Sequence, residues 1–194
     1  VVKIYCDQNG MFKRGAEPLP ENLSDLSALV IRENCDIGFA VDPDSDRLAI
    51  IDERGKPLGE EYTLVLAAAG YLSQKENSEV LVTNLSSSIA LDKLADKYNS
   101  TVLRSAVGEI NVINKMVECN SSFGGEGNGG VILKDAHLGR DALVGAALIL
   151  SYLSHQKTTL SETHKALPQY VIVKDKINIK LSLIHISEPT RQFA

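Results

Sequence analysis

Cysteines, basic clusters and long apolar runs are all scarce in this chain of 194 residues. Its three cysteines, Cys6, Cys35 and Cys119, are an odd number without metal-type spacing, so we expect buried, reduced thiols in a cytoplasmic protein. The net charge is -5 and no basic cluster stands out, which argues against a nucleic acid or an anionic membrane as partner. No apolar run is long enough to span a bilayer, and no signal peptide is recognisable.

The composition that is present, 44% hydrophobic and 23% charged, is ordinary for a globular protein of one large or two small domains. Strand-like stretches are expected at 1–5, 37–41, 48–52, 80–82, 101–103 and 131–133. Helical spacing is expected at 21–33, 59–73, 88–95 with Ser87 or Ser88 as the cap, 108–117 and 140–153. This alternation predicts an α/β fold: two consecutive α/β domains with mixed, mostly parallel sheets and helices on both faces.

The polar residues 74–78 lack periodicity, and we place a domain boundary there. The expected division is a partial first domain at 1–76, a second domain at 77–158 and a linker at 159–180. The chain begins at Val1 in an apparent strand, which suggests a piece of a longer protein. Within 181–194, the stretch from Leu181 to Arg191 resembles an in-frame translation of a transposase sequencing adapter, so we expect it to be an artefact that is excluded from fold reasoning.

The strongest chemical signal is the acidic loop Asp42-Pro43-Asp44-Ser45-Asp46-Arg47 between two apolar strands. Three carboxylates within five residues repel one another, so a fold that holds them together favours a bound cation, and oxygen ligands favour a hard one such as Mg²⁺. We therefore predict Asp42, Asp44 and Asp46 as metal ligands. The alternative is a solvated turn, since Asp, Pro and Ser are ordinary turn residues.

An EF-hand calcium loop is excluded, although the three aspartates occupy its first, third and fifth positions. Its sixth position must be Gly for the sharp turn, and here that position is Arg47. The flanking segments are also strand-like, whereas an EF-hand needs helices.

The second chemical signal is a glycine-rich stretch, 124–130, in which five of seven residues are Gly and the others are Glu126 and Asn128. Glycine lets the backbone approach a ligand closely, and a neighbouring carboxylate and amide suit the paired hydroxyls of a sugar. A flexible hairpin turn is the alternative. The spacing matches neither a dinucleotide-binding fingerprint nor a P-loop.

Taken together, the two loops resemble those of the α-D-phosphohexomutase family, which includes phosphoglucomutases, phosphomannomutases and phosphoglucosamine mutases. The acidic loop is similar to the family's metal loop, and Gly125-Glu126-Gly127-Asn128-Gly129-Gly130 is similar to its sugar-binding loop. Val107-Gly108-Glu109 is similar to a shorter substrate-contacting turn. The resemblance covers 1–179, and it implies the back part of the family's second domain, all of the third and a linker toward the fourth.

The resemblance implies an enzyme of the isomerase class that moves a phosphoryl group between the 1- and 6-positions of a hexose phosphate, through a phosphoserine and a hexose bisphosphate. Mg²⁺ would be held by the three aspartates, and Arg47 would contact the phosphoryl group, with a structural salt bridge as its other interpretation. The implied substrate-binding residues are Gly108, Glu109, Glu126 and Asn128.

The chain departs from the family pattern in two ways. The family's sugar loop commonly has Ser at the position of Asn128 and His at that of Gly130, which leaves the identity of the hexose open. The family's phosphorylated serine and its main phosphate-binding loop lie in its first and fourth domains, neither of which is in these residues. A non-catalytic Mg²⁺-binding or sugar-binding α/β module is the alternative function.

Overall fold

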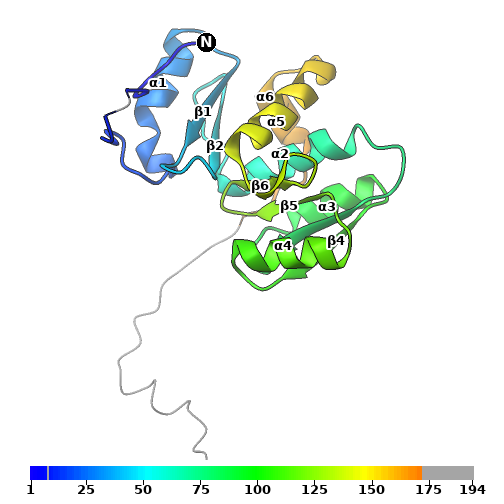
Figure 1. Ribbon diagram of the computed structural model, residues 1–194. Coiled ribbons are helices and arrows are strands. Elements are labelled where there is room, and N and C mark those ends of the chain that lie inside the picture. Colours follow the sequence, from blue (N-terminus) through cyan, green and yellow to red (C-terminus); the bar gives the residue numbers. More distant parts are fainter. Residues whose placement is uncertain (8, 172–194) are drawn as a thin grey trace, which may run out of the picture.

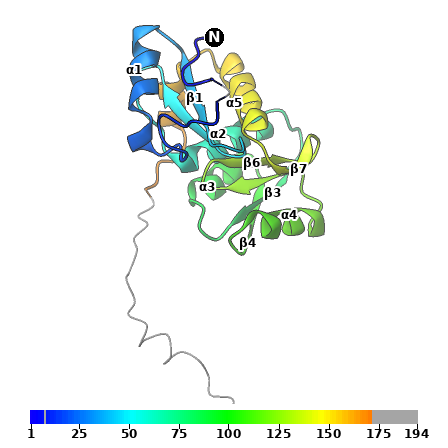
Figure 2. The same ribbon diagram turned by 60° about the vertical axis from the view of Figure 1, so that its left-hand side comes forward.

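The computed structural model describes residues 1–7 and 9–171 of the chain (Figure 1). The expected adapter segment at 181–194 and the linker residues 172–180 lie outside the described residues. The described chain has the predicted α/β fold, in two units that Figure 2 shows beside each other, with α1 and β1 beside the larger sheet and not within it.

The first unit is a helix packed on a two-stranded antiparallel hairpin. Its elements are η1 (Pro20–Asn22), α1 (Ser24–Arg32), β1 (Ile37–Val41) and β2 (Leu48–Asp52). All of β2 is buried because its alternating side chains enter two cores. Ala49 and Ile51 pack with Val30 of α1, whereas Leu48 and Ile50 join the core of the second unit. The strand that follows the acidic loop is therefore held from both sides.

The second unit is built on a five-stranded sheet in the order β4-β3-β5-β6-β7. Its strands are β3 (Val80–Asn84), β4 (Thr101–Ser105), β5 (Phe123–Glu126), β6 (Gly130–Leu133) and β7 (His137–Arg140). The pairings of β3 with β4 and β5 are parallel, and those of β6 with β5 and β7 are antiparallel. The sheet is mixed as predicted but not mostly parallel, since two of its four strand pairings are antiparallel. This antiparallel half arises because the glycine-rich stretch forms a hairpin.

Helices cover both faces of this sheet. They are α2 (Glu60–Leu72), α3 (Ala90–Lys97), α4 (Glu109–Glu118) and α5 (Ala142–Gln156), with a short α6 (Leu160–Ala166) after them. Leu81 packs into the core with α2, α3 and α5, whereas its neighbour Val82 packs with α4. Figure 1 accordingly shows α2 and α5 above the sheet and α4 below it. Gly70 lets α2 lie against α5, since a Cβ there would meet the backbone oxygen of Leu148.

The packing of α2 places this helix in the second unit. Eleven of its thirteen residues are buried, and their apolar side chains belong to the same core as Leu81 and Phe123. Residues 74–78 form a polar surface connection from α2 to β3. We therefore propose that the two domains divide between β2 and α2, at about residues 53–59, instead of at 74–78.

Several local expectations need correction. Residues 1–5 form no strand, because no described strand pairs with them. The helix expected at 140–153 begins at Ala142, with Asp141 as its N-cap, and Arg140 ends the unforeseen strand β7. The polar sequence of β7 carries no apolar alternation that would have predicted it. Residues 160–166 of the expected linker form α6, which begins with a capping box between Thr159 and Glu162.

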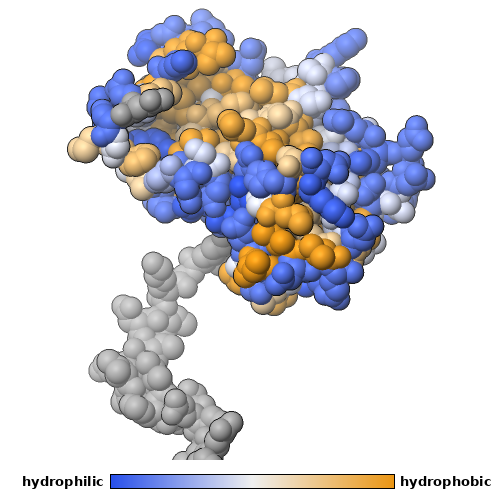
Figure 3. Space-filling view, in the orientation of Figure 1, coloured by the Kyte–Doolittle hydropathy of each residue, from blue (hydrophilic) through white to orange (hydrophobic). Residues whose placement is uncertain are grey.

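The surface differs from the expectation in one respect. The three cysteines are free, but none is buried: Cys6 is exposed and the other two are partly exposed. Hydrophobic residues gather on the face of the first unit seen in Figure 3. Met11 and Phe12 are among the large hydrophobic residues with exposed side chains. Within residues 1–7 and 9–171, no helix has both the length and the apolar character needed to cross a membrane.

Candidate active site

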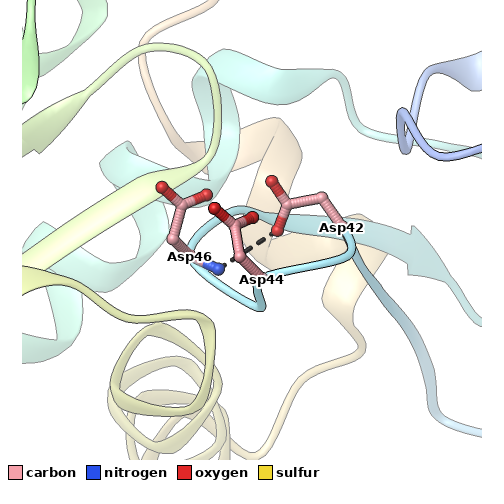
Figure 4. A group of neighbouring side chains, drawn as sticks. All are labelled: Asp42, Asp44 and Asp46. Atoms are coloured by element: carbon pink, nitrogen blue, oxygen red, sulfur yellow. Dashed lines mark hydrogen bonds between the residues drawn. The ribbon is translucent and has the colours of Figure 1, made fainter.

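The acidic loop is wrapped around the carboxylate of Asp42, which directly follows β1 and is 2% exposed. Its Oδ1 accepts hydrogen bonds from the backbone amides of Asp46, at 3.1 Å, and Arg47, at 3.0 Å. Ser45 takes a left-handed conformation, with φ of 60°, that lets the chain reverse direction. Figure 4 shows the resulting arrangement, in which the carboxylates of Asp42, Asp44 and Asp46 point to the same side of the loop.

These three carboxylates fit a hard divalent cation. One oxygen from each lies within 4.8 Å of the others, and all three are oxygen ligands. The Oδ1 atom of Asp46 is buried and accepts no hydrogen bond from the described residues. An unsatisfied buried carboxylate oxygen is costly, and a bound cation would satisfy it. Asp44 is exposed, so the site opens to solvent on its side.

The surroundings of Asp42 and Asp46 shift the pKa values of the two carboxylates in opposite directions. Burial raises the pKa of Asp46 to about 6, and the hydrogen bond and charge of Asp42 add to this, while Arg140 opposes it. Burial also raises the pKa of Asp42, but hydrogen bonds from the backbone and side chain of Arg47 outweigh it, so the pKa lies below its usual value. A cation bound between the two would favour the ionised form of both.

Arg47 is held by carboxylates on two sides. Its Nε donates to Oδ2 of Asp42 at 2.5 Å, and its Nη1 and Nη2 donate to Glu17 at 2.6 and 3.1 Å. These bonds fit the interpretation of Arg47 as a structural salt bridge. Its contact with a phosphoryl group remains a prediction.

Glu126 stands at the end of β5, on the tip of the glycine-rich hairpin, with a side chain only 4% exposed. Its Oε1 accepts from Nδ2 of Asn84 at 2.6 Å and from the backbone amide of Gly108 at 3.2 Å, and its Oε2 accepts from Arg140 at 2.9 Å. The structure thus brings the 107–109 turn against the glycine-rich hairpin. Asn128 lies in the β5–β6 turn, where its Oδ1 accepts from the amide of Gly130 at 3.2 Å.

The two predicted loops adjoin each other. The backbone amide of Leu48 donates to the carbonyl of Gly129 at 3.0 Å, and Arg47 forms an antiparallel bridge with Gly130. A Cβ at Gly129 would collide with the backbone of Leu48, so this close approach requires glycine. The candidate metal site and the candidate sugar site therefore lie next to each other.

Arg140 joins these sites, although no local pattern marked it. Its Nη1 bonds Glu126 at 2.9 Å, its Nη2 bonds Oδ2 of Asp46, and its Nε lies 3.6 Å from Oε2 of Glu109. The backbone amide of Arg140 also donates to Oε1 of Glu109 at 2.7 Å. A Cβ at Gly130 would collide with Cδ of Arg140, but this dependence is visible only in the folded structure, so no sequence signal marked Arg140.

A buried polar network at the end of β3 binds the backbone of the glycine-rich hairpin. Ser87 Oγ accepts from the amide of Gly127 at 2.9 Å and donates to Oδ1 of Asn84 at 2.8 Å. Ser87, one of the two serines expected to cap the next helix, therefore holds the glycine-rich turn. The N-cap of α3 is Ile89, so neither serine occupies that position, although Ser88 Oγ accepts from the amide of Ala90 at 3.1 Å.

A cavity of about 410 Å³ reaches the acidic loop from the first unit. It is lined by residues of the 4–14 segment, α1, β1 and the loop, including Arg14 and Asp42. Glu126 and Arg140 do not line it, so we assign the sugar site to the junction of the two loops and not to this cavity.

Comparison with known families gives matches over nearly all of the described chain. Residues 50–171 match the family described as phosphoglucomutase/phosphomannomutase, alpha/beta/alpha domain III. Residues 1–55 match alpha/beta/alpha domain II of the same family. The two matches meet at residues 50–55, next to the division between β2 and α2.

Individual relatives agree with these matches. The chain is 34% identical to a phosphoglucomutase/phosphomannomutase of Thermococcus kodakarensis, over 93% of this chain and 40% of that protein. It is 34% identical to a phosphoglucosamine mutase of Clostridium botulinum, over 99% of this chain and 44% of that protein. A solved phosphoglucomutase/phosphomannomutase family protein from Burkholderia thailandensis superposes with a TM-score of 0.68 and 26% identity, covering 79% of this chain and 33% of that one. The chain thus spans about 40% of the length of such relatives.

Proposed function

The chain belongs to the phosphoglucomutase/phosphomannomutase family, and we propose that it carries the metal site and the sugar site of a phosphohexomutase. The proposed reaction moves a phosphoryl group between the 1- and 6-positions of a hexose phosphate, through a phosphoserine and a hexose bisphosphate. The observation that carries the proposal is the contact between the acidic loop and the glycine-rich hairpin, made by Leu48 with Gly129 and by Arg140.

The acidic loop would serve the phosphoryl group. Asp42, Asp44 and Asp46 would hold Mg²⁺, which when bound neutralises charge on the phosphoryl group in transfer. Arg47 would direct to the same group the N–H bonds of its guanidinium that are not donated to Asp42 or Glu17. The nucleophilic serine would come from a part of the enzyme outside these 194 residues.

The glycine-rich hairpin would serve the sugar. Among the described residues, two donors occupy both lone-pair positions of Oε1 of Glu126, whereas Oε2 accepts one bond and has one position for a sugar hydroxyl. Asn128 would add its amide hydrogens from the turn, and Glu109 would contribute a second carboxylate. These groups recognise hydroxyls, so glucose, mannose and glucosamine phosphates are all candidate substrates.

The test uses the enzyme extended to the full length of its relatives. Glucose 1-phosphate, mannose 1-phosphate and glucosamine 1-phosphate are each supplied with Mg²⁺ and a catalytic amount of the matching 1,6-bisphosphate, and the 6-phosphate is measured. We expect turnover of at least one of them, and loss of turnover in Asp44→Asn. A folded extended enzyme that converts none of the three, but still binds Mg²⁺ or the sugars, would be a binding module instead.

A further inference from the structure

Arg140 sits among three carboxylates that come from three separate segments of the chain. Asp46 belongs to the acidic loop, Glu109 to the first turn of α4 and Glu126 to the end of β5. The side chain of Arg140 is only 17% exposed, so these contacts are partly shielded from solvent. Among the arginines of the described residues, Arg140 alone has a side chain that contacts carboxylates of both candidate sites, since Arg47 reaches the hairpin only through its backbone bridge with Gly130.

The position of this guanidinium depends on residue 130 being glycine, which has no side chain. The stem of Arg140 crosses Gly130, and a Cβ at residue 130 would collide with its Cδ. The neighbouring strands β6 and β7 fix this crossing, because Ile132 of β6 pairs with Arg140 of β7. Gly130 therefore gives Arg140 the path by which it reaches the junction.

The contacts of Asp46 indicate what Arg140 does there. The guanidinium binds Oδ2 of Asp46, while Oδ1 of the same carboxylate is buried and accepts no hydrogen bond from the described residues. Nε of Arg47 lies 3.5 Å from that oxygen without donating a hydrogen bond to it. One oxygen of Asp46 is thus fixed by the protein, and the other is left for a ligand.

We propose that Arg140 is a positioning residue that joins the cation site to the sugar site: it turns Oδ1 of Asp46 toward the bound cation and holds Glu126 in place for the sugar. This inference rests on the proposed function and names a residue that neither loop pattern contains. The planar fork of Arg140 can hold two carboxylates at once, which a single ammonium group cannot do in the same geometry.

The proposal predicts whether Mg²⁺ binding becomes weaker or stronger when Arg140 is replaced. Removing a positive charge beside a cation site strengthens cation binding if the charge acts only by repulsion. Removing a residue that orients a metal ligand weakens cation binding, typically about 10-fold to 100-fold. The two effects of Arg140 therefore have opposite directions, and one measurement separates them.

The measurement is calorimetric titration of Mg²⁺ into the purified 194-residue chain. We expect Arg140→Met to weaken Mg²⁺ binding about 10-fold or more. The matched control is Arg54→Met, which removes the same charge from an arginine paired with Asp52 at the far end of β2, and which should leave the affinity within about 2-fold of the wild type. An Arg140→Met variant with native circular dichroism and equal or tighter Mg²⁺ binding would overturn the proposal.

Two further variants keep the test decisive if Arg140→Met does not fold. Arg140→Lys keeps the charge and loses the fork, and Gly130→Ala keeps Arg140 but displaces its stem. Both should weaken Mg²⁺ binding, although neither removes a charge. If both bind Mg²⁺ as the wild type does, the proposal fails.

A second readout reports the link between the two sites. In the wild type, Mg²⁺ titration should shift the backbone amide signals of Gly125 and Gly127, on either side of Glu126, in nuclear magnetic resonance spectra. In Arg140→Lys at saturating Mg²⁺, these shifts should shrink, and unchanged shifts would contradict the link. Because these measurements need no turnover, an extended enzyme that fails to convert hexose phosphates would remove the proposed function and leave this result standing.

Discussion

Glu126 is bound on both oxygens before any sugar arrives. Asn84, Gly108 and Arg140 each donate to its carboxylate, and the carboxylate is almost fully buried. A carboxylate held in this way loses little conformational freedom when it accepts one more hydrogen bond. Its rigidity suits a reaction in which the same carboxylate must receive the sugar in two orientations.

We predict that Glu126→Ala in the extended enzyme lowers kcat/KM in both directions of the mutase reaction. A hydrogen bond to a charged group contributes about 1.5–3 kcal/mol, so the loss should be about 10-fold to 100-fold. Forward and reverse initial rates, with circular dichroism as a folding control, measure it. If a folded Glu126→Ala variant kept its kcat/KM in both directions, the glycine-rich hairpin would have no role in sugar binding.

We predict a different effect for Asp44→Ala. Asp44 is exposed and its side chain does not hold the loop together, whereas Asp42 is buried and binds two backbone amides of the loop. Asp44→Ala should therefore leave the melting temperature nearly unchanged and sharply lower kcat, with little recovery on added Mg²⁺. Asp42→Ala is the comparison, and it should lower both. Full rescue of Asp44→Ala by excess Mg²⁺ would show that Asp44 contributes affinity alone.

The residues of the site differ in how visible they are in the sequence. Asp42, Asp44 and Asp46 lie within five positions, and Glu126 lies among glycines, so local spacing was enough to predict that they matter. Arg140 lies 94 residues from Asp46, and only strand pairing brings them together. Such a contact between distant residues has no local pattern, which is why Arg140 could not be found from the sequence.

At the scale of single elements, helices were easier to predict than strands. The amphipathic spacing of α1 and α4 gave these helices to within a few residues, because each buries one face. A strand also needs a partner: residues 1–5 have strand-like composition without a described partner, and β7 has a partner without strand-like composition. Strand pairing decided the outcome for residues 1–5 and for β7, and it cannot be predicted from the local sequence.

The helix α6 carries a histidine that should make stability depend on pH. His164 packs edge-on against Tyr62, with ring centroids 4.3 Å apart, and its Nε2 is buried without a hydrogen-bond partner among the described residues. Burial, with Lys56 and Arg54 nearby and Asp52 opposing them, lowers its pKa below the usual 6.5. The folded state therefore disfavours the charged imidazolium.

We predict that this histidine destabilises the fold at acidic pH. A group whose pKa is lower in the folded state contributes its full stability above pH 6.5 and loses it as the pH falls through the folded pKa. Between pH 7.5 and 5.5, the melting temperature of His164→Gln should fall less than that of the wild type. The exposed His155→Gln is the control and should follow the wild type. Parallel curves for His164→Gln and the wild type would exclude the effect.

At the scale of the whole molecule, β2 ties the two units together. Its residues alternate between the core that contains α1 and the core that contains α2 and α5, so neither unit has a complete core without this strand. The apolar run at 48–51 predicted a strand, but a continuous apolar run cannot reveal that its two faces belong to different units. This shared strand is why the acidic loop, which precedes it, stays fixed against the glycine-rich hairpin.

This shared strand leads to a prediction about cooperativity. Ile50 and Ile51 are adjacent and both at most 1% exposed, yet Ile50 packs into the core of the second unit and Ile51 into that of the first. If β2 couples the units, Ile50→Ala and Ile51→Ala should each leave one cooperative unfolding transition for the whole chain. Each should lower the free energy of unfolding by about 2–5 kcal/mol, as is usual for such core truncations. Denaturant unfolding should be followed together with hydrogen exchange of the amides of Ala40 and Val82, one from each unit. In both variants the two amides should lose protection in parallel. If Ile51→Ala weakened the protection of Ala40 alone, the units would unfold separately, and β2 would hold the acidic loop against the hairpin only by the contacts at its own end.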